Sequence, residues 1–231
     1  SILFLLKMNQ IKSNLGRPQL VDREKILTAV LAVGIEQFSM HSVAKYLGVS
    51  ATTLYRYFDS KEALLDACMD EFCACIHLPP KTLHWQEYLR RLGHEFRDAL
   101  KQMPGAYAYG TRLGPTTPAA FRIIEESLTV LLADGFEHRL AWRAYGMLLD
   151  HVFVFAEKEE RMAALEQTHG PGGYKVLRLS PDESKPYPNM TETLTAVMPP
   201  DFDHSYEEQL QTLLNGIAAD LKQQTQAEAG K

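Results

Sequence analysis

The sequence lacks the features of a membrane-spanning protein and of a secreted protein held by disulfides. No apolar run approaches the length needed to cross a bilayer, and the most apolar segment, residues 141–156, is interrupted by two charged residues and a histidine. Among the 231 residues there are only three cysteines, Cys68, Cys73 and Cys75, an odd number that cannot close a set of disulfides. We therefore expect a cytoplasmic protein whose thiols serve as small apolar residues, with redox sensing as the alternative role.

The short motifs of common enzyme classes are missing as well. There is no Gly-x-Ser-x-Gly, no dinucleotide-binding glycine pattern after a strand and no cluster of metal ligands. Gly170-Pro-Gly-Gly173 lacks the Gly-Lys-Ser/Thr ending of a phosphate-binding loop. No window sustains the alternation of a strand, so the predicted fold is all-α. We expect no catalytic residue, no metal site and no cofactor, and a small-molecule enzyme is the least favoured alternative.

Positive charge is concentrated near the N-terminus. Residues 7–61 hold eight Lys or Arg against four Asp or Glu, whereas the whole chain has a formal net charge of −5. A basic segment on an acidic body is typical of a protein that binds DNA at one end, so the overall acidity does not argue against DNA as a partner.

Residues 40–58 predict two short helices joined by a tight turn. Gly48 lies where the chain must turn in a left-handed conformation, and Ser50 can cap the second helix. That helix is expected to run from Ala51 to Phe58, with Leu54 and Phe58 buried four residues apart. The arrangement predicts a helix-turn-helix whose second helix enters the major groove.

Residues 27–67 resemble the DNA-binding domain of the tetracycline-repressor (TetR) family. The resemblance is carried by Gly34–Glu36, Leu47–Ser50, Thr53–Tyr55 and Ala63–Leu65. It implies a transcriptional repressor that binds a double-stranded palindromic operator as a homodimer and is released by a small molecule. The candidate DNA-binding residues are Arg17, His41, Ser42, Ala51, Thr52, Thr53, Tyr55, Arg56, Tyr57 and Lys61.

The candidate DNA contacts have different expected roles. Arg56 and Thr52 are placed to reach base edges, where an arginine can make a bidentate contact to guanine. Tyr55 and Lys61 resemble residues that grip phosphates, which set register without reading sequence. Arg17 belongs to a basic arm that can reach the minor groove or remain disordered.

Helical periodicity continues along the rest of the chain. Asp22 and Ser39 are expected to cap the first two helices, Asp59–Glu62 has the pattern of a capping box, and Thr117 caps a helix opened by Pro118. The first helix is expected to end near Val33. Further helices are expected at about 61–76, 85–103, 118–133, 137–165 and 205–223, with a short helix or turn at 107–112 and a loop at 168–190. The predicted organisation is an N-terminal extension with a basic arm (1–18), a helix-turn-helix domain (19–78), an effector-binding and dimerisation domain (79–225) and a frayed tail (226–231).

The C-terminal part resembles the effector domain of the tetracycline repressor, after which the family is named. Residues 85–90, Gly110–Arg112, 131–136 and 202–217 carry this likeness. The resemblance, together with neighbouring residues, gives the candidate ligand-binding set His77, Leu92, Phe96, Tyr109, Thr111, Arg112, Ser127, Asp150 and His151.

Three departures from that repressor argue against a magnesium–tetracycline ligand. Tyr107–Tyr109 stand where the repressor has a histidine that helps hold the metal, and the asparagine that grips the drug corresponds to Leu92. A second metal-associated histidine corresponds to Asp150, although His151 is adjacent. The aromatic residues of this part (Phe96, Tyr107, Tyr109, Phe121, Trp142 and Phe153) favour a flat or apolar effector instead.

Two apolar helical stripes predict a dimer interface. A single chain is not expected to cover them fully, so matching helices of a partner would bury both. The candidate interface residues are Leu148, Val152, Leu210, Leu213, Leu214 and Ile217. An architectural or ligand-independent DNA-binding protein remains the alternative to a ligand-released repressor.

Overall fold

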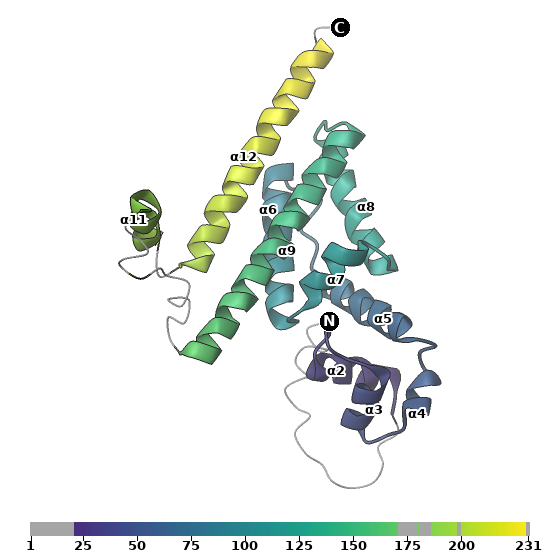
Figure 1. Ribbon diagram of the computed structural model, residues 1–231. Coiled ribbons are helices and arrows are strands. Elements are labelled where there is room, and N and C mark those ends of the chain that lie inside the picture. Colours follow the sequence, from purple (N-terminus) through teal and green to yellow (C-terminus); the bar gives the residue numbers. More distant parts are fainter. Residues whose placement is uncertain (1–20, 171–179, 181–185, 198–199, 230–231) are drawn as a thin grey trace. The chain divides into compact units, whose positions relative to one another are not determined.

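The computed structural model describes residues 21–170, 180, 186–197 and 200–229, apart from the side chains of residues 111–113 and 228. Within these ranges all regular structure is helical, as predicted (Figure 1). The helices are α2 (Arg23–Val33), α3 (Met40–Leu47), α4 (Ala51–Tyr55), α5 (Lys61–Cys75), α6 (Trp85–Gln102), α7 (Ala106–Leu113), α8 (Pro118–Ala133), α9 (His138–His169), α11 (Pro188–Val197) and α12 (Phe202–Ala229).

Side-chain caps set the start of each N-terminal helix. Asp22 accepts a hydrogen bond from the amide of Lys25 at 2.8 Å, and Ser39 forms a reciprocal capping box with Ser42. Ser50 caps α4 by accepting from the amide of Thr53 at 3.3 Å. These caps supply acceptors for amides that have no partner inside their own helix, which is why the predicted starts are correct.

The turn between α3 and α4 has the predicted geometry. Gly48 adopts φ 69° and ψ 27°, a left-handed conformation that costs glycine little. Leu54 and Phe58 are both buried, as expected. However, α4 ends at Tyr55 rather than Phe58, so Phe58 reaches the core from the chain after the helix.

Helix α5 leads from the helix-turn-helix to the rest of the chain. Its N-cap is Ser60, which accepts from the amide of Ala63 at 3.0 Å. This single cap, one residue later, replaces the capping box expected at Asp59–Glu62, because Ala63 has no side chain that could bond back. The same helix packs on α2 and on α8. Asp70 of α5 accepts from the backbone amide of Ala119 at 2.9 Å, which ties α5 to the first turn of α8.

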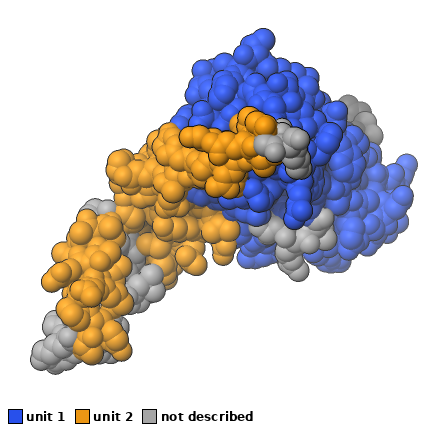
Figure 2. Space-filling model, turned by 90° about the horizontal axis from the view of Figure 1, so that it is seen from above, with its two compact units in different colours: residues 1–153 blue, residues 154–231 orange. Residues whose placement is uncertain are grey.

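The chain divides into two compact units, residues 1–153 and 154–231 (Figure 2). The boundary predicted at residues 78–79 therefore falls inside the first unit, because α5 packs on α8. In the second unit, the ring of Phe155 packs edge-on against those of Phe202 and Tyr206, with centroids 6.2 and 5.1 Å away.

The helices of the second unit extend beyond the sequence-based expectation. α9 continues to His169, and α12 begins at Phe202 and continues to Ala229, into the segment expected to fray. α11 begins with Pro188 inside the expected loop, since the fixed φ of proline suits a first helical position. No residue of α11 is buried, and the sequence therefore offered no core-facing stripe from which to predict it. None of the described helices is long and apolar enough to cross a membrane.

Candidate functional site

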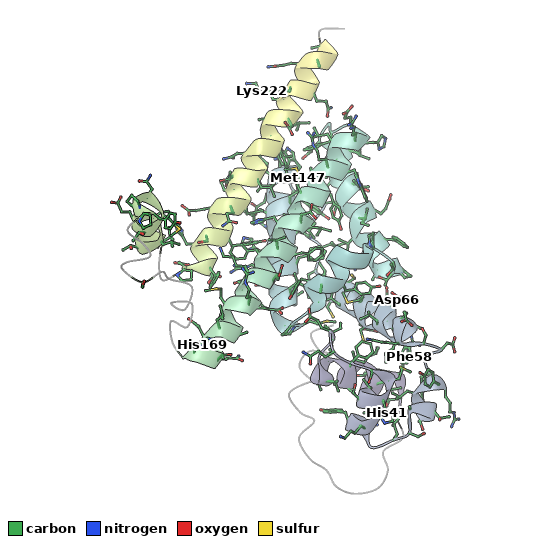
Figure 3. All side chains as sticks on the ribbon, in the orientation of Figure 1. His41, Phe58, Asp66, Met147, His169 and Lys222 are labelled. Carbon is green, nitrogen blue, oxygen red and sulfur yellow. The ribbon has the colours of Figure 1, made fainter. Side chains whose placement is uncertain are left out.

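The helix-turn-helix exposes several of the predicted DNA contacts together. Thr52, Tyr55 and Arg56 are exposed on and just after α4. His41 is exposed on α3 (Figure 3). Ala51 is half-buried at the start of α4. The ammonium group of Lys61 is exposed and lies 5.0 Å from the centre of the Phe38 ring, which holds this cation beside the helix-turn-helix.

The hydroxyl groups of three other predicted DNA contacts form hydrogen bonds with neighbouring groups of the same chain. The Ser42 hydroxyl accepts from the amide of Ser39 at 2.8 Å as part of the capping box. The Thr53 hydroxyl lies 3.0 Å from that of Ser50, and the Tyr57 hydroxyl donates to the carbonyl of Val21. These hydroxyls stabilise the domain, and sequence spacing alone did not reveal those partners. Arg17 lies outside the described residues.

A cavity of about 280 Å³ lies among α5, α6, α7, α8 and α9 in the first unit. Its walls are mainly apolar and aromatic, as is usual for sites that take small organic molecules. The lining residues are Met69, Phe72, Cys73, Phe96, Ala106, Tyr109, Gly110, Gly114, Pro115, Thr116, Thr117, Ala120, Ile123, Ile124, Trp142, Tyr145, Gly146, Leu149, Asp150 and Phe153.

The polar groups of the cavity connect it to α5. The Tyr109 hydroxyl donates to the carboxylate of Asp66 on α5 and lies 2.5 Å from the hydroxyl of Thr116. Thr116 also donates to the same carboxylate oxygen, at 3.1 Å (Figure 3 labels Asp66). Burial, together with the Asp66 hydrogen bond, raises the pKa of Tyr109 to about 12, so its phenol stays neutral and donates at physiological pH.

The predicted ligand-binding residues separate into three groups: those that line the cavity, those whose side chains are not described, and those that lie away from it. Phe96, Tyr109 and Asp150 line the cavity. The side chains of Thr111 and Arg112 lie outside the described part, although both residues belong to α7.

Four predicted ligand contacts lie away from the cavity. His77 follows the end of α5, and its 65% exposed side chain pairs with Glu95 at 3.6 Å instead. Leu92 is fully buried, and the Ser127 hydroxyl donates to the carbonyl of Ile123 at 2.7 Å. His151 is half-buried on α9 but is absent from the cavity wall. The carried-over positions and the cavity wall therefore coincide only in part, and a ligand contact at these four residues stays a prediction.

One face of α9 supplies wall residues that were missing from the predicted set. Tyr145, Gly146 and Leu149 line the cavity together with Trp142 and Phe153, two of the aromatic residues that favour a flat or apolar effector. The spacing of positions 142, 146, 149, 150 and 153 places them on one side of a helix, a pattern that was available in the sequence. Cys73 also lines the cavity, from α5.

The donor set of the cavity does not fit a magnesium site. Mg²⁺ requires near-octahedral oxygen ligands and is usually held through carboxylates. Asp150 is the only carboxylate residue among the described lining residues, and the described part of the chain holds no group of three His, Cys, Asp or Glu placed to bind a metal.

The predicted interface residues are mostly buried within one chain. Leu148, Val152, Leu210, Leu214 and Ile217 are at most 1% exposed, and Leu213 is half-buried. One chain thus covers most of these two stripes, and their role in a dimer stays a prediction. Met147 and Val154, seven residues apart on α9, are instead exposed, by 39% and 61%.

The fold and its sites define a helix-turn-helix regulator with a helical, cavity-bearing C-terminal region. The profile described as "Bacterial regulatory proteins, tetR family" matches residues 29–68, and "Tetracyclin repressor-like, C-terminal domain" matches residues 78–221. The chain belongs to the TetR family of transcriptional regulators and, as a member of that family, is not an enzyme.

Similar proteins agree with this assignment. The class D tetracycline repressor of Escherichia coli is 30% identical over 212 residues, which cover 87% of this chain and 91% of the repressor. The structure is similar to that of ActR from Streptomyces coelicolor in complex with actinorhodin, with a TM-score of 0.70, 19% identity, and coverage of 88% and 99% of the two chains. It is also similar to a possible TetR-family regulator from the same organism, with a TM-score of 0.65, 25% identity, and coverage of 86% and 99%.

Proposed function

We propose that this protein is a ligand-responsive repressor that acts in the cytoplasm. It binds a palindromic operator as a homodimer and leaves the DNA when a small aromatic or apolar effector occupies the cavity. Two recognition helices must lie about one DNA turn apart, roughly 34–36 Å, to read such a palindrome. An effector changes this fit by binding one spacing of the two helices better than another.

The hydrogen bonds between Asp66 and the cavity wall carry this proposal. Asp66 lies on α5, the helix that begins three residues after Phe58 of the helix-turn-helix core. Tyr109 and Thr116, which both line the cavity, donate to its carboxylate. A ligand that competes for either hydroxyl must change how α5 is held. The path from the cavity to the DNA-binding helices is therefore a single helix, held by charge-assisted hydrogen bonds.

Exposed apolar side chains support the homodimer. Met147 and Val154 lie two turns apart on one side of α9, where a partner would remove them from water. A dimer that buries this side of α9 would explain why these two apolar side chains are exposed in a single chain.

Operator selection followed by an effector screen tests the proposal. The operator is selected from random duplexes, and sedimentation of the complex then gives the number of chains per operator. Thermal-shift screening of drug-like and metabolite libraries finds binders, because a ligand that binds only the folded state stabilises it by mass action. Two chains on a palindrome and operator release by a cavity binder are the expected results. A monomer on an asymmetric site, or binders that never change operator affinity, would support a ligand-independent DNA-binding protein instead.

A further inference from the structure

Aromatic rings from four helices surround the cavity. Phe72 comes from α5, Phe96 from α6 and Tyr109 from α7, and α9 adds Trp142 and Tyr145. The face of an aromatic ring carries negative electrostatic potential, which attracts cations and is strongest for tryptophan. These walls therefore accept a flat apolar body and also favour a positive charge placed over a ring.

Among the described side chains, the formal charges at the cavity are negative. Asp150 carries the only formal charge among the described lining residues, and it is exposed on α9. Asp66 lies behind the wall, joined to Tyr109 and Thr116 by hydrogen bonds. Both carboxylates disfavour an anion in the cavity and favour a cation.

A glycine leaves room between the carboxylate and the indole. Gly146 lies four residues after Trp142 and four before Asp150, so all three share one side of α9. A helix rises about 1.5 Å per residue, which puts each neighbour roughly 6 Å from Gly146 along the axis. A Cβ at Gly146 would meet no atom within 4 Å, so the space over this glycine is open.

We propose that the space over Gly146, between Trp142 and Asp150, is a subsite for an organic cation: a positively charged nitrogen carried on a flat aromatic body. The aromatic body occupies the apolar cavity, while the charged nitrogen lies between the indole and the carboxylate. Trp142 is 56% exposed, so the cation keeps part of its hydration and avoids the full cost of burying a charge. The subsite is defined by the cavity itself. Only the expected result of binding, which is release from the operator, rests on the proposed function.

Three probes of nearly equal shape and different charge test the inference. They are 1-methylquinolinium (cation), 1-methylnaphthalene (neutral) and 1-naphthoate (anion), each titrated into the full chain without DNA by calorimetry. We expect the cation to bind roughly tenfold or more tightly than either of the others. Asp150→Asn should bring the affinities of the cation and the neutral probe to within about threefold of each other. Asp98→Asn, a matched change at an exposed carboxylate of α6 outside the cavity, should leave the preference unchanged.

Two further variants identify the subsite. Gly146→Val fills the open space, so it should weaken the binding of the cation more than the binding of the neutral probe. Trp142→Leu removes the indole face and should have the same effect while keeping an apolar side chain. Circular dichroism and thermal unfolding of each variant separate a filled subsite from a damaged fold.

Several results would overturn the cation subsite. These are a cation that fails to bind at millimolar concentration, an anion that binds as tightly as the cation, or a cation preference that survives Asp150→Asn. A preference for the anion that disappears in Arg112→Gln would assign the opposite charge selectivity to Arg112. Selective cation binding without operator release would leave the subsite standing and remove the proposed function. Operator release by an uncharged effector, with no cation preference, would support the proposed function and overturn the cation subsite.

Discussion

Gly110 lies directly against the ring of Phe153. A Cβ at this glycine would come within 2.7 Å of the ring Cζ atom and 2.8 Å of Cε2, closer than non-bonded atoms tolerate. Phe153 in turn packs edge-on against Phe96, with ring centroids 6.3 Å apart. The missing side chain of Gly110 therefore lets α7 approach α9 and fixes the position of an aromatic wall of the cavity.

Gly110→Ala should displace Phe153 and distort the cavity. Overpacking of this kind costs about 1–3 kcal/mol, which the better helix propensity of alanine offsets only in part. We expect lower stability in urea denaturation and weaker binding of 1-methylquinolinium. Phe153→Leu in the Gly110→Ala background should recover part of the lost stability. A double variant no more stable than Gly110→Ala would show that the ring is not the obstacle.

Tyr109→Phe should weaken the coupling between the cavity and the DNA-binding helices while leaving the cavity shape intact. The substitution removes the hydroxyl that donates to Asp66 and keeps the ring. Because hydrogen bonds to charged groups contribute about 1.5–3 kcal/mol, the free energy of unfolding should fall by up to that amount. Operator affinity measured by fluorescence anisotropy should then respond less to a bound effector than in the parent protein. Asp66→Asn should show the same reduced response, whereas Glu71→Gln, at an exposed position on α5, should respond like the parent.

Cys73 should react slowly with alkylating reagents, and an occupied cavity should slow it further. Burial, followed by the nearby Asp70, raises the pKa of the Cys73 thiol to about 12, so only about one thiol in ten thousand is ionised at pH 8. In a Cys68→Ala/Cys75→Ala variant, the rate of iodoacetamide labelling should rise about tenfold per pH unit from pH 8. Because the thiol's folded pKa is raised, its contribution to stability is complete below about pH 9 and is lost as pH rises toward 12. Rapid labelling at pH 7, unaffected by 1-methylquinolinium, would mean that the thiol is open to solvent and is not covered by a ligand in the cavity.

Arg56→Ala and Lys61→Ala should change DNA binding in different ways. Arg56 is exposed at the end of α4 and is placed to read a base, so its loss should relax sequence preference by about 1–3 kcal/mol at one position. Lys61 lies over Phe38 at the start of α5. Its loss should weaken binding to all DNA sequences about equally and should reduce the salt dependence of that binding. Binding-site selection at two salt concentrations measures both effects. An unchanged base preference in Arg56→Ala would contradict its assigned role.

Val154→Glu should dissociate the proposed dimer without unfolding the chain. Val154 is 61% exposed in the single chain, so a charge there costs little in the monomer but much in an apolar interface. Leu214→Glu should instead destabilise the protomer itself, because Leu214 is fully buried. Sedimentation velocity together with circular dichroism distinguishes the two outcomes. The same substitution at a 55% exposed valine of α11, Val197→Glu, is the control. An intact dimer of Val154→Glu would place the interface elsewhere.

The sequence by itself determined the local structure of the DNA-binding region. Ser39, Ser50 and Gly48 act on backbone groups within a few residues of themselves, and Leu54 and Phe58 are four residues apart. Interactions of such short range can be recognised from residue type and spacing. The all-helical fold and the starts of most helices follow from the same signals.

Tertiary structure decided the cavity and which apolar stripes remain exposed. Gly110 and Phe153 meet across 43 positions of sequence, as do Asp66 and Tyr109, and no local pattern encodes either pair. The periodicity of Leu214 shows that it is apolar on a helical face but does not show whether its own chain or a partner covers it. His77 and Asp150 were both expected at the cavity, yet only Asp150 lines it. Distant contacts of this kind depend on how whole helices pack, and a one-residue change in where a helix ends redirects every side chain beyond it.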